Sequence, residues 1–138
     1  MSEFGVTGTP PARLSIGLVS AGRVGTAIGA ALERRGHVVS AVVARSQRSR
    51  DLASRRLPEA RVAEPADVAQ ACELLVLAVP DSALPGVVTE LAEAGAFRPG
   101  HIVVHVAGAV GADVLRPAAE AGAVVVAAHP AMTFTGSE

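Results

Sequence analysis

The sequence predicts an α/β protein built on a doubly wound parallel sheet of about six strands. Short runs rich in Val, Leu and Ala alternate along the chain with segments that suit helices. These runs are apolar almost throughout, which is typical of strands buried on both faces of a parallel sheet. The segments between them are long enough for right-handed helical crossovers. At 138 residues, the chain is long enough for one domain with a hydrophobic core and too short for two ordinary domains.

In the first half of the chain, β-branched residues mark the expected strands, and glycine and proline mark the ends of the expected helices. The expected elements are a strand over 14–19, a helix over 23–35 that ends at Gly36, a strand over 38–44, a helix over 48–56 that ends before Pro58, a strand over 61–63 and a helix that starts at Pro65. We expect residues 1–13 to form a flexible leader and residues 14–138 to form the domain.

In the second half, the most apolar run covers residues 74–80 and is expected to be a central strand. A helix over 82–94 follows it, and Pro85 is tolerated there because it falls in the first turn, where no backbone N–H is needed. The remaining expected elements are a turn over 98–100, a strand over 101–108, a helix over 112–120 that ends near Gly122, and a strand over 123–128.

The composition excludes several classes of function. The net charge of −1 gives no global positive field for nucleic acid, and the apolar runs are far too short to span a membrane. The chain has no Lys and no Tyr, which excludes a Tyr–Lys proton relay and Schiff-base chemistry. The single cysteine, Cys72, and the four dispersed His residues predict no internal disulfide and no metal site. The N-terminus lacks the pattern of a secretory signal, so we expect a cytoplasmic protein.

A glycine turn over residues 20–25, with the sequence SAGRVG, connects the first strand to the first helix. In a strand–turn–helix unit, this spacing predicts a cradle for the phosphates of a dinucleotide. Gly22 would let the backbone approach a pyrophosphate, and Gly25 would let the helix pack on the strand. The six expected cofactor-binding residues of this turn are Ser20, Ala21, Gly22, Arg23, Val24 and Gly25. The alternative is a strand–helix turn without a ligand.

The residues after the second strand predict which dinucleotide binds. An NAD site usually has an acidic residue there to accept hydrogen bonds from the ribose hydroxyls, but this chain has no acid between the strand and Asp51. Arg45 and Ser46, with Arg48 or Arg50, would instead bind a 2′-phosphate, which favours NADP. The same absence argues against a methyltransferase. The alternative for these arginines is a solvated basic helix face.

Three segments together resemble one family: residues 17–29 (GLVSAGRVGTAIG), 103–115 (VVHVAGAVGADVL) and 127–136 (AAHPAMTFTG). They are similar to the N-terminal half of Rossmann-like oxidoreductases that carry a helical C-terminal domain of unknown function. Those proteins are distant relatives of 6-phosphogluconate and β-hydroxyacid dehydrogenases and of pyrroline-5-carboxylate reductase.

The resemblance covers about residues 14–136 and implies NADP(H) binding and hydride transfer on a small carbonyl or hydroxy compound. Two residues depart from the family pattern, because relatives usually have glycine where Ser20 stands and many have serine where Ala107 stands. Relatives place much of the substrate pocket in their helical domain. We therefore expect residues 1–138 alone to bind NADPH, to turn over negligibly and to associate as a homo-oligomer. A non-catalytic NADP(H)-sensing module is the alternative function.

Ligands of a parallel sheet bind beyond the carboxyl ends of its strands. Three such ends carry Val79 and Pro80, His105 and Gly108, and His129. We expect Val79, Pro80 and Gly108 to contact the cofactor, and we take His105 and His129 as candidate acid–base groups. The alternative for each imidazole is a purely structural role.

The segment AVPDSA, residues 78–83, is expected to pass beneath the nicotinamide ribose and to contact it mainly through backbone atoms. The alternative for Asp81, which we favour, is that it caps the following helix. His37 and His101 lie at strand beginnings, at the other edge of the sheet, and are expected to face solvent.

Overall fold

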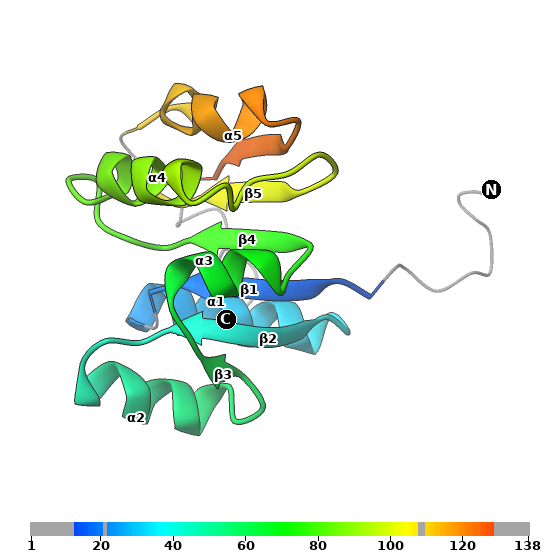
Figure 1. Ribbon diagram of the computed structural model, residues 1–138. Helices are drawn as coiled ribbons and strands as arrows, with labels where there is room; N and C mark the ends of the chain where they lie inside the picture. The colour runs from blue at the N-terminus through cyan, green and yellow to red at the C-terminus, as the bar shows by residue number, and fades with distance from the viewer. Residues whose placement is uncertain (1–12, 21, 108–109, 129–138) are drawn as a thin grey trace.

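The computed structural model describes residues 13–20, 22–107 and 110–128. They form a six-stranded, wholly parallel sheet in the order β3-β2-β1-β4-β5-β6, which confirms the expected α/β doubly wound fold (Figure 1). The elements are β1 (Ser15–Val19), α1 (Arg23–Arg34), β2 (Val38–Val43), α2 (Gln47–Arg56), β3 (Arg61–Val62), α3 (Pro65–Gln70), β4 (Leu74–Leu77), α4 (Leu84–Glu93), β5 (Ile102–His105), the 3-10 helix η1 (Ala112–Leu115), α5 (Arg116–Glu120) and β6 (Val124–Ala127).

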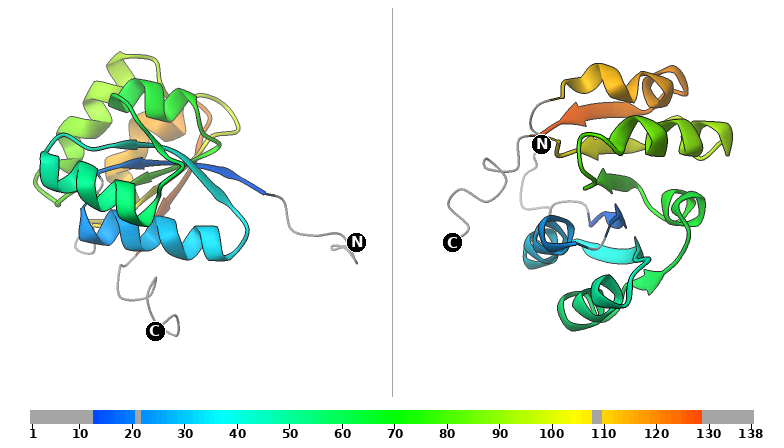
Figure 2. Two further views of the ribbon diagram at one scale, coloured as in Figure 1. Left: turned by 90° about the horizontal axis from the view of Figure 1, so that it is seen from below. Right: turned by 90° about the vertical axis from the view of Figure 1, so that its left-hand side faces the viewer.

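Helices cover the two faces of the sheet, α1 and α2 on one face and α3, α4 and α5 on the other (Figure 2). Successive strand residues alternate between two cores because side chains of a strand point to opposite faces. Leu75 and Leu77 of β4 pack toward the layer of α3, α4 and α5, whereas Val76 packs toward α1 and α2. All three are buried, as the continuous apolar pattern predicts.

The strand order reverses its direction at β1, which pairs with β2 on one side and with β4 on the other. We call this position the switch point of the sheet. The chain runs outward from β1 to β3, crosses back to β4, and then runs outward again to β6. The turns that follow β1 and β4 therefore leave the carboxyl edge of the sheet in opposite directions. This is the position at which doubly wound sheets bind ligands.

Several boundaries differ from those expected. The central strand ends at Leu77 instead of reaching residue 80, and Ala78 continues the ladder with only one more bond, from its N–H to the Val19 carbonyl (3.1 Å). Pro80 cannot donate to a ladder, and the chain turns away there. The expected helix over 112–120 divides into η1 and α5, because Pro117 lacks the N–H that a continuous α-helix would need.

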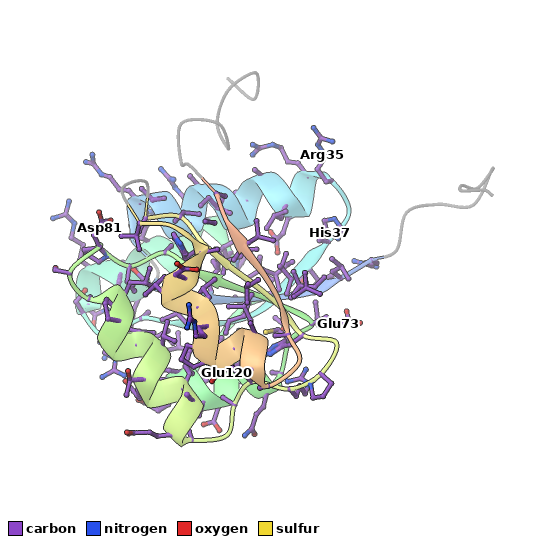
Figure 3. All side chains as sticks on the ribbon, turned by 90° about the horizontal axis from the view of Figure 1, so that it is seen from above. Arg35, His37, Glu73, Asp81 and Glu120 are labelled. Carbon is purple, nitrogen blue, oxygen red and sulfur yellow. The ribbon has the colours of Figure 1, made fainter. Side chains whose placement is uncertain are left out.

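The expected cap at Asp81 is wrong. Helix α4 starts at Leu84 with Ala83 at its N-cap position, and no side chain caps it. Asp81 is exposed in the preceding turn, at the opposite end of the sheet from His37 and Glu73 (Figure 3).

The expectation of solvent-facing histidines is wrong for His101, which is 1% exposed. Its Nε2 lies 3.8 Å from the Sγ of Cys72, which is also buried. In the described residues, its Nδ1 has no hydrogen-bond partner. Burial, together with the nearby charge of Arg98, lowers the pKa of His101 below its ordinary value of 6.5. His37 is half-buried, and its Nδ1 accepts a hydrogen bond from the Leu14 N–H (3.1 Å).

Burial also sets the state of the only thiol. It raises the pKa of Cys72 to about 11, against the opposing effect of Arg98, so the thiol stays protonated at neutral pH. The Arg98 guanidinium donates to the carbonyl oxygens of Ala69 (3.2 Å) and Cys72 (2.6 Å). The end of α3 is thereby tied to the loop before β5.

The edge strand β6 departs from the expectation that the strands are covered on both faces. Val124 is 58% exposed and Val126 is 41% exposed. Their neighbours in β5 are Ile102 and Val104, which are only half-buried. Over the described residues, no helix has the length and apolar character that crossing a membrane requires.

The buried state of His101 predicts a stability that depends on pH. Because its pKa is lowered in the folded protein, the unfolded chain binds a proton more readily below pH 6.5, and the free energy of unfolding falls as the pH falls below that value. The slope is at most about 1.4 kcal/mol per pH unit for one proton. Urea unfolding of the wild type and of His101→Gln between pH 5 and 8 measures it. The variant should have the flatter profile, and equal profiles would contradict the prediction.

Candidate functional site

A cleft of about 510 Å³ opens at the carboxyl edge of the sheet, where β1, β2 and β4 end. Its walls come from these strand ends, from the starts of α2 and α3, and from α4. The lining residues are Val19, Ser20, Gly22, Val43, Arg45, Ser46, Ser49, Pro65, Val79, Val87 and Glu90. Five of the residues expected to bind a cofactor, Ser20, Gly22, Arg45, Ser46 and Val79, are brought together here from three loops.

The turn after β1 holds Ser20 in a conformation that favours glycine. Its φ is +90°, and among the described residues it is the only non-glycine with a positive φ. An L-residue in this region is strained by about 1–2 kcal/mol. The structure thus keeps the tight turn that the first glycine of the fingerprint normally makes, with serine in its place.

The two glycines of the turn differ in what surrounds them. A Cβ atom on Gly25 would overlap the carbonyl oxygen of Ser20 and would lie 3.4 Å from the Cβ of Ala78. Gly25 is therefore required for α1 to start so close to β1. A Cβ on Gly22 would meet only the Ser20 Oγ, at 3.6 Å, and the φ of −78° at Gly22 suits any residue. Neither the fold nor the backbone conformation requires glycine at position 22.

The N-terminus of α1 faces this turn without a capping side chain. Gly22 occupies the N-cap position, and the first turn of the helix contains no acidic residue. The side chain of Thr26 does not cap the N–H groups, because its Oγ1 donates to the Gly22 carbonyl (2.9 Å). Arg23 and Val24 are exposed in the first turn. The positive end of the helix dipole is thus left available to an anion.

Ser46 occupies the N-cap position of α2 at the end of the loop after β2. Its Oγ accepts from the Ser49 N–H (3.0 Å), and the Ser49 Oγ accepts from the Ser46 N–H (3.1 Å), which forms a capping box. Arg45, the preceding residue, pairs its Nη2 with Oε1 of Glu64 at 3.4 Å.

A smaller groove of about 250 Å³ continues from the cleft between the starts of α1 and α2. Its lining residues are Gly22, Arg23, Ser46, Arg48, Ser49 and Leu52. Gly22, Ser46 and Ser49 line both the groove and the cleft. The groove therefore joins the glycine turn to the arginine-containing loop after β2.

His105 has no ring nitrogen available for proton transfer in this structure. It is fully buried, its Nδ1 accepts from the Ala107 N–H (3.1 Å), and its Nε2 lies 2.9 Å from the Gly111 carbonyl oxygen. Because Nδ1 accepts, the ring proton is on Nε2 and is donated to Gly111. The geometry favours the structural role over the acid–base role.

Pro80, which is also expected to bind the cofactor, is exposed and does not line the cleft. Three other expected residues, Ala21, Gly108 and His129, lie outside the described residues. In the part of the chain that the structure does describe, no three His, Cys, Asp or Glu side chains gather as a metal site requires.

Sequence reasoning missed six residues of the cleft, namely Val19, Val43, Ser49, Pro65, Val87 and Glu90. Val19 and Val43 are the last residues of β1 and β2. The spacing of Ser46 and Ser49 is that of a capping box and could have revealed Ser49. Pro65 and the two α4 residues reach the cleft through tertiary packing. No local pattern in the sequence marks them.

The topology, the switch point at β1 and the glycine turn define a dinucleotide-binding type of α/β fold. A family model agrees: the chain belongs to the Rossmann-like domain family, whose model matches residues 3–130. This confirms the resemblance found in the sequence. No curated protein matches the chain in sequence.

The solved structures similar to this chain include dehydrogenases and reductases. An imine reductase of Streptomyces aurantiacus is 26% identical, with a TM-score of 0.65 over 82% of this chain and 40% of that one. The 3-hydroxyisobutyrate dehydrogenase of Mycobacterium tuberculosis is 15% identical, with a TM-score of 0.71 over 86% and 40%. An imine reductase of Myxococcus stipitatus in complex with NADP⁺ is 19% identical, with a TM-score of 0.64 over 86% and 43%. The chain thus spans less than half the length of these three proteins.

The different surroundings of the two glycines predict different costs of substitution. Gly25→Ala should lower the free energy of unfolding by at least about 2 kcal/mol, because its Cβ meets backbone that cannot move aside easily. Gly22→Ala should cost less than about 1 kcal/mol, the range of an N-cap exchange. Denaturant titrations of both variants test this, and equal costs would contradict it.

Proposed function

We propose that this chain is the NADP(H)-binding domain of an oxidoreductase that transfers a hydride to or from a small carbonyl or hydroxy compound. The observation that carries this proposal is Gly22, which lines the cleft although neither its backbone conformation nor its neighbours require glycine. Close approach of a ligand to the backbone explains a glycine at that point, and the pyrophosphate of a dinucleotide makes such an approach.

The charge pattern around Gly22 supports an anionic ligand of this length. The uncapped start of α1 would bind the pyrophosphate through the N–H groups near Arg23 and Val24. The groove beside it leads to Ser46 and Arg48, and Arg45 lines the neighbouring cleft. A guanidinium group suits a 2′-phosphate, which NADP has and NAD lacks. These residues support NADP(H) over NAD(H).

The oxidoreductase class is supported by the proteins of the same fold. They include dehydrogenases and imine reductases, one of them in complex with NADP⁺ and a variant of that enzyme in complex with NAD⁺. NADPH, when bound, supplies the hydride. The described residues would then bind and orient the cofactor, and Val79, which follows β4, would lie beside its nicotinamide.

Proton transfer is not assigned to His105, since both of its ring nitrogens are bonded to the backbone. His129 remains the candidate for that role. The same geometry at His105 suits the alternative function, a module that senses NADP(H) without turnover. A steady-state assay with a panel of small carbonyl compounds, run on this chain and on any longer form of the protein, separates these two functions.

The first test of the proposed function is the loss of binding in a variant of the glycine turn. Gly22→Val places branched bulk where the pyrophosphate would approach the backbone, so NADPH affinity should fall at least about 100-fold, or about 2.7 kcal/mol. Calorimetric titration measures the affinity, and thermal melting verifies that the variant is folded. A folded variant that binds NADPH as the wild type does would contradict the proposed cradle.

The second test is the choice of cofactor. NADPH should bind at least about tenfold more tightly than NADH, a difference of about 1.4 kcal/mol. Arg45→Glu should abolish most of this preference, because a carboxylate repels the 2′-phosphate and accepts hydrogen bonds from ribose hydroxyls. Equal wild-type affinities for the two cofactors would contradict the assignment of NADP(H).

A further inference from the structure

Arg45 stands between two cavities at the carboxyl edge of the sheet. On one side is the cleft described above, and on the other is a polar cavity of about 650 Å³ beyond β2 and β3. The second cavity is lined by Val43, Ala44, Arg45, Arg50, Val62, Ala63, Glu64 and Asp67. Two arginines and two carboxylates line it, so an anion that enters has to compete with these carboxylates for the arginines.

The partner of Arg45 in this second cavity is Glu64, at 3.4 Å between Nη2 and Oε1. The pair is exposed, with 63% of the Arg45 side chain and 76% of the Glu64 side chain accessible. An exposed pair of this kind contributes about 0.2–1 kcal/mol. The guanidinium is therefore held only weakly and can exchange one anionic partner for another.

The sheet register brings Glu64 to this position. β3 pairs with β2 through Ala41 and Arg61 and through Val42 and Val62, and the Ala63 N–H extends the ladder to the Val42 carbonyl (2.9 Å). The residue after Ala63 therefore emerges beside the end of β2. The loop after β2 has no acid of its own before Asp51, yet an acidic side chain lies beside it in space.

Resting on the proposed function, we infer that Glu64 is a specificity-determining residue for the cofactor and acts through Arg45. A 2′-phosphate that binds Arg45 has to displace the Glu64 carboxylate from the guanidinium. The negative charge of Glu64 therefore lowers the affinity of this site for a phosphate. A cofactor with a free 2′-hydroxyl does not need Arg45 and is not penalised in this way. Glu64 thus reduces the ratio of NADPH affinity to NADH affinity that Arg45 raises.

Neighbouring acids provide matched controls. Asp67 lies in the first turn of α3, for which Glu64 is the N-cap residue, and it lines the same cavity. Its carboxylate forms no ion pair with Arg45 in the described residues. Asp51 is bonded within its own helix, α2, because its Oδ1 accepts a hydrogen bond from the Gln47 side-chain amide at 2.8 Å. A role carried by the contact between Glu64 and Arg45 should therefore not be shared by Asp67.

The experiment measures the dissociation constants of NADPH and NADH for the wild type, Glu64→Gln, Asp67→Asn, Arg45→Gln and the double variant Arg45→Gln/Glu64→Gln. The chain has no Trp and no Tyr, so the emission of the bound dihydronicotinamide can be followed without protein background. Glu64→Gln should tighten NADPH about fivefold at low salt, the upper range for an exposed pair, and leave NADH within about twofold. The gain should shrink as salt is added.

In the Arg45→Gln background, the Glu64→Gln exchange should have no effect, which is the signature of coupling between the two side chains. The inference is overturned, with the proposed function intact, if Glu64→Gln leaves the NADPH-to-NADH ratio unchanged. It is also overturned if Asp67→Asn has an equal effect or if the gain persists without Arg45, since the cause would then be long-range charge. A wild type that binds neither dinucleotide overturns the proposed function itself and the inference with it.

Discussion

The close approach of α1 to β1 is the constraint on which the rest of the structure depends. At three glycines of this unit, an added Cβ would come closer than 3.0 Å to a neighbouring atom: Gly17 to Cys72 and Val68, Gly25 to the Ser20 carbonyl, and Gly29 to the end of the Leu18 side chain. Because β1 lies between β2 and β4, these contacts fix the centre of the sheet to both helical layers. They also place the start of α1 at the carboxyl edge, where the strands next to β1 end. The cleft is a consequence of this packing.

The turn at Ser20 shows how that constraint is met with an atypical residue. The left-handed conformation is imposed from both sides, by the end of a buried strand and by a helix that cannot start further away. The strain at Ser20 is tolerated because the surrounding contacts over-determine the backbone. The same contacts fix the helix start relative to the ends of β1, β2 and β4, so these segments would need little further ordering if a ligand bound between them.

The parts of the fold and site that could be predicted are those with a local cause. The glycine turn, the continuous apolar strands and the arginine-containing loop each have their signal within a few consecutive residues, and they appear in the structure where expected. The parts that could not be predicted depend on packing between distant segments. Glu64 reaches Arg45 through the pairing of β2 with β3, and Glu90 reaches the cleft from the second half of α4. His101 is buried against Cys72, which follows α3. Asp81 had a good local signal for a cap, but Pro85 and the turn before it shift the helix start beyond its reach.

The single cysteine has a practical consequence for measuring how this domain opens. The Cys72 thiol is buried beneath Gly17, protonated and in contact with His101, so a reagent in solution cannot attack it in the native fold. Reaching the sulfur requires α3 to separate from β1, the strand that carries Gly17. The rate of thiol alkylation therefore reports the rate or the equilibrium of that separation, depending on whether closing is slower or faster than the reagent. With no second cysteine to complicate the signal, the chain contains its own probe of core opening.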